Sequence, residues 1–313
     1  MKRIAVAQIA PKYLDRRATI DKAVSIIEEA AGKNASLVVF SECFVSGYPT
    51  WAWRLRPGGD MGVYTDIHAR FLQSAVDVSA GDLDPLCAAA KACGIAVSIG
   101  INERDGAFSR STLFNSNVLI GHDGAVLNIH RKLMPTNPER MIHGLGDGRG
   151  LHVVDTPAGR VGVLICWENY MPLARFALYA QGVDLYLAPT WDCSATWQSS
   201  LQHIAREGGC HVIGVASCVH GRDIPADFPH RDQVFPDDAE CINPGNSSAY
   251  SPGGTCIAEP VGGKERLFLV EIDPDEAARA RRSLDAAGHY NRCDIFDLEI
   301  DRQPQAPARF RDT

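Results

Sequence analysis

The segment RVGVLICWENYMPLARFALYAQGVDLYLAP, residues 160–189, decides the fold class. Its two ends, RVGVLIC (160–166) and VDLYLAP (183–189), are short apolar runs of the kind found in buried strands. The stretch between them, 172–181, has the apolar spacing of an amphipathic helix. A strand, a helix and a second strand in succession indicate an α/β protein.

The same alternation continues on both sides of this segment. Further buried strands are predicted at 3–9, 36–40, 95–101 and 211–217, and further helices at 15–31, 84–93 and 194–208. The stretches 112–120 and 125–129 form a hairpin around His122-Asp123-Gly124, so the sheets are expected to be mixed rather than purely parallel. Two more strands (255–258 and 267–272) and a helix (275–288) follow.

No internal repeat of fixed period is visible, and nothing in the sequence separates two domains. The polar stretch 221–247 carries four prolines, but strands resume after it. We therefore interpret it as a functional or interface loop within one domain.

Composition excludes several classes of protein. The 313 residues are 45% hydrophobic and carry a formal charge of −7, which argues against disorder and against a nucleic-acid or anionic-membrane partner. No apolar run reaches the roughly 18 residues of a membrane span, and the first residues are too short an apolar run for a signal peptide. None of the ten cysteines forms a Cys-x-x-Cys pair. We expect reduced thiols, a cytoplasmic location and no metal or other cofactor.

Four residues could carry chemistry. Cys166 ends a predicted strand just before a helix, where a nucleophile would sit at a sharp turn beside a free backbone N–H. Glu42 follows the strand 36–40, Lys132 follows the hairpin in HRKLMPTNPER, and Glu139 lies in that same segment. Taken singly, each has an ordinary explanation: a packed thiol, a solvated acid, a surface lysine, an ion-pair partner.

Together, the segments VFSECFVSGYP, HRKLMPT and LICWENYMPLARFALYAQG resemble the three motifs of the carbon–nitrogen hydrolase, or nitrilase, superfamily. The resemblance implies that Glu42, Lys132 and Cys166 are the catalytic residues, and that Glu139 is the additional glutamate near them. It extends over nearly the whole chain, from IAVAQIAP to GHYNRCDIFDL. It also implies a four-layer α-β-β-α sandwich of two mixed β-sheets.

Within the superfamily, CWENYMPLAR, GYPTW, PTNPERMIHGLGDG, APTWD and AGHYNRCDIF look like the nitrilase branch. The implied reaction converts a small organic nitrile to a carboxylic acid and ammonia through a covalent cysteine thioimidate and thioester. A thiolate nucleophile, a carboxylate base and an ammonium group are the groups that such a reaction needs. Near the motifs, the residues expected to bind substrate are Tyr48, Trp167, Thr190 and Trp191.

The resemblance also implies an assembly. Residues 1–275 are expected to form the carbon–nitrogen hydrolase domain, and 276–313 a C-terminal helix and tail that faces a partner copy. Members of the superfamily usually dimerise through helices, and the candidate surfaces here are 172–181 and 194–208. A homodimer or a larger homo-oligomer is therefore expected.

Alternative functions remain open at this point. An amidase or carbamoylase would use the same three residues on a C=O substrate, and hydrogen cyanide is a further possible substrate. A non-catalytic binding protein on the same fold would be expected to lose at least one of Glu42, Lys132 and Cys166, yet all three are present. A metal-dependent hydrolase is disfavoured because no His/Cys/Asp cluster has ligand spacing.

Overall fold

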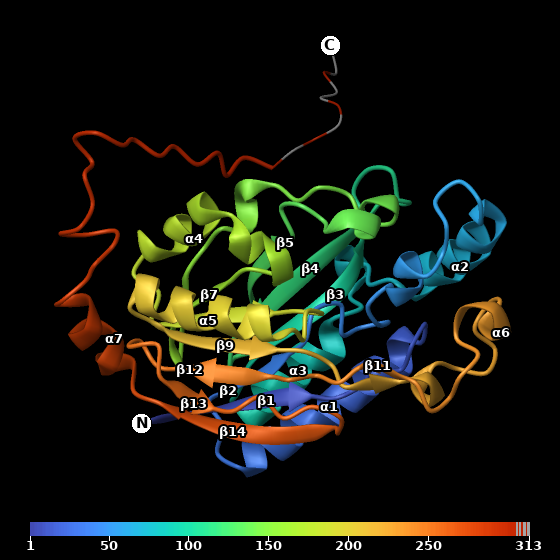
Figure 1. Ribbon diagram of the computed structural model, residues 1–313, viewed down its shortest axis with the longest axis horizontal. Coiled ribbons are helices and arrows are strands. Elements are labelled where there is room, and N and C mark those ends of the chain that lie inside the picture. The colour runs from blue at the N-terminus through green and yellow to red at the C-terminus, as the bar shows by residue number, and fades with distance from the viewer. Residues whose placement is uncertain (305, 307, 309–310, 312–313) are drawn as a thin grey trace.

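Two six-stranded mixed sheets lie face to face, and helices cover the outer face of each (Figure 1). This computed structural model describes residues 1–304, 306, 308 and 311. The four-layer α-β-β-α sandwich predicted from the sequence is confirmed.

The first sheet has the order β14-β1-β2-β3-β4-β5. Its strands are β14 (Arg266–Ile272), β1 (Lys2–Gln8), β2 (Leu37–Phe40), β3 (Ala96–Arg104), β4 (Leu113–Ile120) and β5 (Val126–Arg131). β1, β2 and β3 run parallel, and every other neighbouring pair in this sheet is antiparallel.

The second sheet repeats this arrangement. Its order is β13-β12-β9-β8-β7-β6, with β13 (Cys256–Ala258), β12 (Ser248–Tyr250), β9 (His211–Val215), β8 (Leu185–Pro189), β7 (Gly159–Val163) and β6 (Val154–Thr156). Here β7, β8 and β9 run parallel and the remaining pairs are antiparallel. Counted from β14 in the first sheet and from β6 in the second, the parallel and antiparallel pairs follow in the same order. A separate ribbon pairs β10 (Val219–His220) with β11 (Cys241–Asn243).

Alternating side chains explain the layers. On β1, Ile4 and Val6 pack into the core between the sheets, whereas Ala5 and Ala7 pack beneath the outer helices. The helices α1 (Arg16–Gly32) and α3 (Asp84–Cys93) cover the first sheet, and α4 (Pro172–Tyr179) and α5 (Ala195–Gly208) cover the second. Both faces of each sheet are therefore buried, which is why the strands read as continuous apolar runs.

The structure differs from the sequence-based elements in several places. Helix α2 (Met61–Ser74) was not predicted; its buried residues pack in a separate cluster with the segment 219–235. The stretch 221–247 is not entirely loop, because it contains α6 (Arg231–Val234) and β11. Helix α7 (Pro274–Arg281) is shorter than the expected 275–288, since Ala277 is its only buried residue.

The remaining elements are short 3-10 helices. These are η1 (Thr50–Trp53), η2 (Val78–Ala80), η3 (Asn137–Met141), η4 (Gly148–Gly150), η5 (Cys166–Tyr170) and η6 (Gly221–Asp223). Two of them, η3 and η5, follow β5 and β7 and carry predicted site residues. Within the described residues, no helix combines the length and apolar character needed to cross a membrane.

Candidate active site

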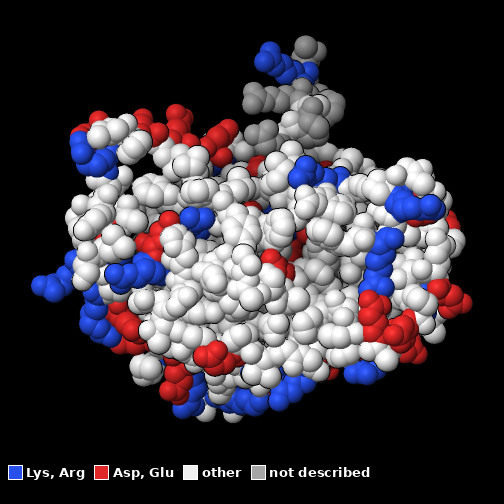
Figure 2. Space-filling model, in the orientation of Figure 1, with Lys and Arg blue, Asp and Glu red and all other residues white. Residues whose placement is uncertain are grey.

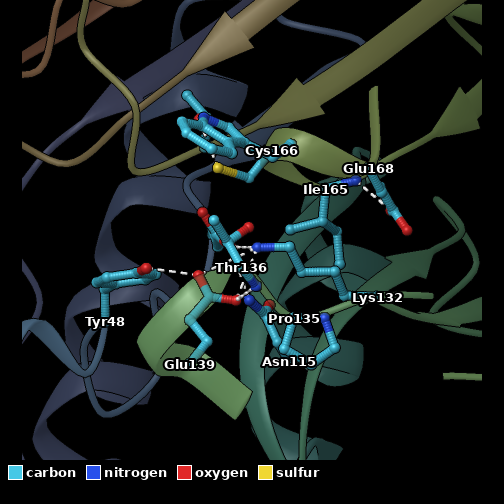
Figure 3. A network of polar contacts seen from close by, with 12 residues as sticks. Tyr48, Asn115, Lys132, Pro135, Thr136, Glu139, Ile165, Cys166 and Glu168 are labelled. Carbon is cyan, nitrogen blue, oxygen red and sulfur yellow. Dashed lines mark hydrogen bonds and ion pairs between the residues drawn. The ribbon is translucent and has the colours of Figure 1, made fainter. Parts of the chain in front are cut away.

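The four predicted catalytic residues come from three connections, which follow β2, β5 and β7 and are brought together by the two sheets (Figure 3). Glu42 stands two residues beyond β2, and Lys132 directly follows β5. Glu139 lies in η3, and Cys166 opens η5 just beyond β7. The connections with Glu42, Lys132 and Glu139 follow strands of the first sheet, and the connection with Cys166 follows a strand of the second.

A buried ammonium group lies between two buried carboxylates. The Nζ of Lys132 is 2.7 Å from Oε1 of Glu42, and it is 3.1 and 2.9 Å from the two carboxylate oxygens of Glu139. All three side chains are shielded from solvent. Because a buried charge is costly unless it is paired, this cluster depends on the mutual contacts of its members.

Further hydrogen bonds fix the two carboxylates. Asn115 on β4 donates to Oε1 of Glu42 at 2.7 Å, and the phenol of Tyr48 donates to Glu139 at 2.5 Å. The backbone N–H of Thr136 donates to Oε2 of Glu139 at 2.9 Å. The Oε2 atom of Glu42 has no hydrogen-bond partner among the described residues, so it can accept a proton.

The charges of the cluster set its protonation. Burial raises the pKa of Glu42 from 4.5 to about 7, with Lys132 opposing that rise and Glu139 adding to it. Burial would also raise the pKa of Glu139, but the ammonium of Lys132 and other donors hold it below the ordinary value. Burial acts to lower the pKa of Lys132, yet the surrounding anionic groups hold it well above 10.5. Near neutrality, Lys132 and Glu139 are therefore charged and Glu42 can accept a proton.

Cys166 occupies a strained turn. Its φ of +52° lies in the left-handed region, which non-glycine residues rarely adopt and which is often found at functional sites. This turn also ends the strand at Val163, three residues short of the predicted end. The hydroxyl of Thr190 donates to Sγ at 3.2 Å, and burial together with Glu42 raises the pKa of the thiol to about 12. The thiol is therefore neutral in the resting state.

A cavity of about 310 Å³ opens beside the sulfur. Three predicted substrate-binding residues, Tyr48, Trp167 and Trp191, line it, and the rings of Tyr48 and Trp191 stack with centroids 4.6 Å apart. The fourth, Thr190, contacts the sulfur itself. The cavity wall is completed, besides Cys166, by Trp53, Thr136, Asp192 and Ser194.

Sequence reasoning missed several residues of the site. Asn115 lies 73 residues from its partner Glu42, so no local pattern announces the contact. Asp192 accepts a hydrogen bond from the indole of Trp167 at 2.8 Å, and its own N–H donates to Thr190 at 2.9 Å. Its place in APTWD beside two predicted residues was the signal that could have identified it. Within the described residues, no group of three or more His, Cys, Asp or Glu side chains is arranged to hold a metal ion.

Comparisons with known proteins identify the family to which the chain is similar. The family model described as carbon-nitrogen hydrolase matches residues 3–282. A bifunctional nitrilase/nitrile hydratase of Lupinus angustifolius is 38% identical, with 98% of this chain and 88% of that protein covered. An aliphatic nitrilase of Sinorhizobium fredii is 37% identical, with 97% of both covered.

Solved structures share the fold at lower identity. A carbon-nitrogen hydrolase from Helicobacter pylori is similar with a TM-score of 0.71 and 20% identity, over 94% of this chain and 96% of that one. An amidase from Nesterenkonia has a TM-score of 0.67 and 20% identity, over 90% of this chain and 94% of that one. At this identity the two structures support the fold alone.

Proposed function

This chain belongs to the carbon-nitrogen hydrolase family, and on that premise we propose that it is a nitrilase, which converts an organic nitrile to the carboxylic acid and ammonia. The observation that carries the proposal is the buried Glu42–Lys132–Glu139 cluster beside the strained turn of Cys166. Relatives named nitrilases, aligned over nearly the full chain, support the choice of a nitrile over an amide.

The first step joins Cys166 to the substrate. Because the pKa of its thiol is about 12 and that of Glu42 about 7, the proton leaves as the new bond forms rather than beforehand. Sγ attacks the nitrile carbon, one π bond of C≡N breaks, and the nitrogen takes up the proton to give a thioimidate. Lys132 stabilises the negative charge that develops on that nitrogen.

The second step removes ammonia. Glu42 takes a proton from a water molecule as its oxygen adds to the thioimidate carbon. The nitrogen of the tetrahedral intermediate then receives a proton, the C–N bond breaks and ammonia leaves a thioester behind. A second water molecule cleaves the C–S bond, which releases the acid and restores the thiol. Glu139 stays ionised throughout and holds the charge of Lys132 in place.

The cavity favours an uncharged, flat or apolar nitrile. Aromatic rings from Tyr48, Trp53, Trp167 and Trp191 form most of its wall, and such rings bind apolar groups by area burial and stacking. The rings of Tyr48 and Trp191 lie face to face, 7° from parallel. The carboxylate of Asp192 disfavours a substrate that carries its own negative charge.

A homo-oligomer is the proposed assembly, with α4 and α5 on its interface. Leu173 of α4 is 66% exposed, and its neighbours Met171 and Tyr170 are also partly exposed. In Figure 2, charged side chains lie mainly around the rim of the face that carries these helices, and its centre is largely uncharged. The cytoplasmic location, the division at residue 275 and the partner-facing tail remain proposals of the same kind.

Ammonia release from matched nitriles and amides tests the function, with Cys166→Ala compared against the wild type. We expect the wild type to hydrolyse nitriles and Cys166→Ala to lose that turnover entirely. Cys210→Ala is the matched control, because Cys210 is also buried but lies beneath α5 in the second sheet's outer layer. Turnover of amides alone would make the protein an amidase, and activity in Cys166→Ala would contradict the mechanism.

A further inference from the structure

Glu168 is a buried carboxylate that the steps above do not use. It lies two residues beyond Cys166, is 1% exposed and is not among the residues that line the cavity. Three groups meet on its two oxygens: the backbone N–H groups of Ile165 and Leu133, which donate to it, and the ring Nε2 of His130. The Leu133 bond is 2.8 Å long and His130 Nε2 lies 2.6 Å away.

The two backbone donors are next to residues of the site along the chain. Ile165 directly precedes the nucleophile, and Leu133 directly follows the lysine of the site. His130 is on β5, in the first sheet, whereas Glu168 and Ile165 follow β7, in the second. One carboxylate therefore ties together the two backbone segments that carry Lys132 and Cys166, and Figure 3 shows Glu168 on Ile165 beside this cluster.

We propose that Glu168 is a positioning residue, which with His130 fixes the sulfur of Cys166 relative to the ammonium of Lys132. Only a carboxylate suits the place, because each of its two oxygens accepts a hydrogen bond from a backbone N–H, Ile165 on one and Leu133 on the other, and a carboxylate offers an acceptor at both positions. A glutamine amide would present its own N–H groups to one of them. Hydrogen bonds to an ionised acceptor are also stronger than those to a neutral one, so these contacts hold the two backbone segments firmly.

The positioning should affect how the tetrahedral intermediate breaks down, to acid and ammonia or to an amide. This part of the inference rests on the proposed function. If the nitrogen is protonated, the C–N bond breaks and ammonia leaves. If the C–S bond breaks first, the sulfur departs as thiolate, takes up a proton, and a primary amide is released. Lys132 placed correctly against the bound nitrogen favours the first outcome, and a displacement of about 1 Å can cost roughly 100-fold in rate.

Glu168→Gln tests the role, with Asp77→Asn as the matched control. Asp77 is likewise a buried carboxylate with several donors, from Ser79, Ala80 and Arg104, but it holds η2 instead of the site. We expect Glu168→Gln to lower kcat about 100-fold with little change in KM, and to raise the amide share of the product several-fold. Asp77→Asn should lose thermal stability while both kcat and the amide share stay at the wild-type level.

A second readout needs no nitrile. The rate at which iodoacetamide labels Cys166, followed on its own peptide by mass spectrometry, depends on the groups held near the sulfur. It should change several-fold in Glu168→Gln and remain unchanged in Asp77→Asn. His130→Leu removes the ring contact and keeps both backbone hydrogen bonds to Glu168. It should therefore shift the amide share and the labelling rate in the same direction as Glu168→Gln, but less. If Glu168→Gln does not fold, His130→Leu tests the role of Glu168 instead.

Folded variants with wild-type labelling rate, kcat and amide share would overturn the positioning role. That result would leave the proposed function intact, because the wild type would still hydrolyse nitriles. A wild type without nitrile turnover would instead overturn the function, and the labelling rates alone would then decide the role of Glu168.

Discussion

Glu42 is placed where its ionisation is expensive. It is 1% exposed, and one of its carboxylate oxygens has no hydrogen-bond partner among the described residues. Burial raises its pKa to about 7, so the folded protein binds this proton more tightly than the unfolded chain. The resulting contribution to stability is fully present below about pH 4.5 and is lost as the pH rises through 7. The group that makes a good base therefore weakens the fold at the pH where it works.

Replacing Glu42 by glutamine should separate these two effects. We expect Glu42→Gln to be inactive, because an amide cannot accept the thiol proton, and to unfold at a higher temperature than the wild type at pH 8. This advantage should shrink at pH 5, where the wild-type carboxyl is itself protonated in the folded state. Thermal unfolding at both pH values measures it. An equal gain at both would show that the pKa of Glu42 is not raised.

The pH dependence of the wild-type rate should also reflect the raised pKa of Glu42. With Glu42 as the base, kcat/KM is expected to rise with pH through an acidic limb near 7, and the thiol adds no limb in the neutral range because its pKa is about 12.

For single residues, the sequence was informative where a predicted catalytic residue lies within a local sequence motif. Glu42, Lys132 and Cys166 each follow a recognisable strand, and the resemblance of their segments to the three carbon–nitrogen hydrolase motifs implied that they act together. Asn115 could not be expected, because its contact with Glu42 depends on the strand order of the first sheet. The contacts of His130 and Leu133 with Glu168 could not be expected either, because they join segments that follow strands of different sheets.

Among the elements, β3 supports the site by its lack of a side chain at Gly100. A Cβ there would lie 2.5 Å from the backbone nitrogen of Cys43 and closer still to the carbonyl of Ser41. Those atoms flank Glu42, and backbone cannot move aside as a side-chain tip can. The strand therefore presses directly against the turn that holds the base.

Gly100→Ala should consequently displace Glu42 and lower kcat by about 100-fold, together with a loss of roughly 1–3 kcal/mol of stability from overpacking. Gly214→Ala on β9 is the comparison, since a Cβ there meets only the side chain of Leu201. That variant should keep its kcat even where it loses stability. Steady-state rates and denaturant unfolding of both proteins measure the difference, and equal kcat losses would refute the local explanation.

Element prediction failed where tertiary context decided the outcome. In α2, the buried Tyr64, Ile67 and Phe71 follow helical spacing, so a signal was present. They pack in a separate cluster formed mostly by loop and helix residues, which meets the first sheet at Leu113 of β4. The apolar run 160–166 could not reveal that its last residues leave the sheet, because that depends on the strained turn at Cys166.

At the scale of the whole molecule, the exposed apolar side chains of α4 predict association. Leu173→Glu should convert the wild-type oligomer to a smaller species, because a buried unpaired carboxylate opposes the contact. Light scattering after size exclusion measures the mass. Val126→Glu, on the exposed edge strand β5, should leave the mass unchanged, and a monomeric wild type would contradict the proposed assembly.

The matching strand directions of the two sheets bear on what the proposed activity would report. β14 pairs with β1 as β6 pairs with β7, so each sheet is a complete layer of its own. The proposed site is divided between them, because Glu42 and Lys132 follow strands of the first sheet and Cys166 follows a strand of the second. Under the proposed function, turnover therefore requires that the two sheets are packed against each other, and a substitution that separates them should abolish activity before the chain unfolds.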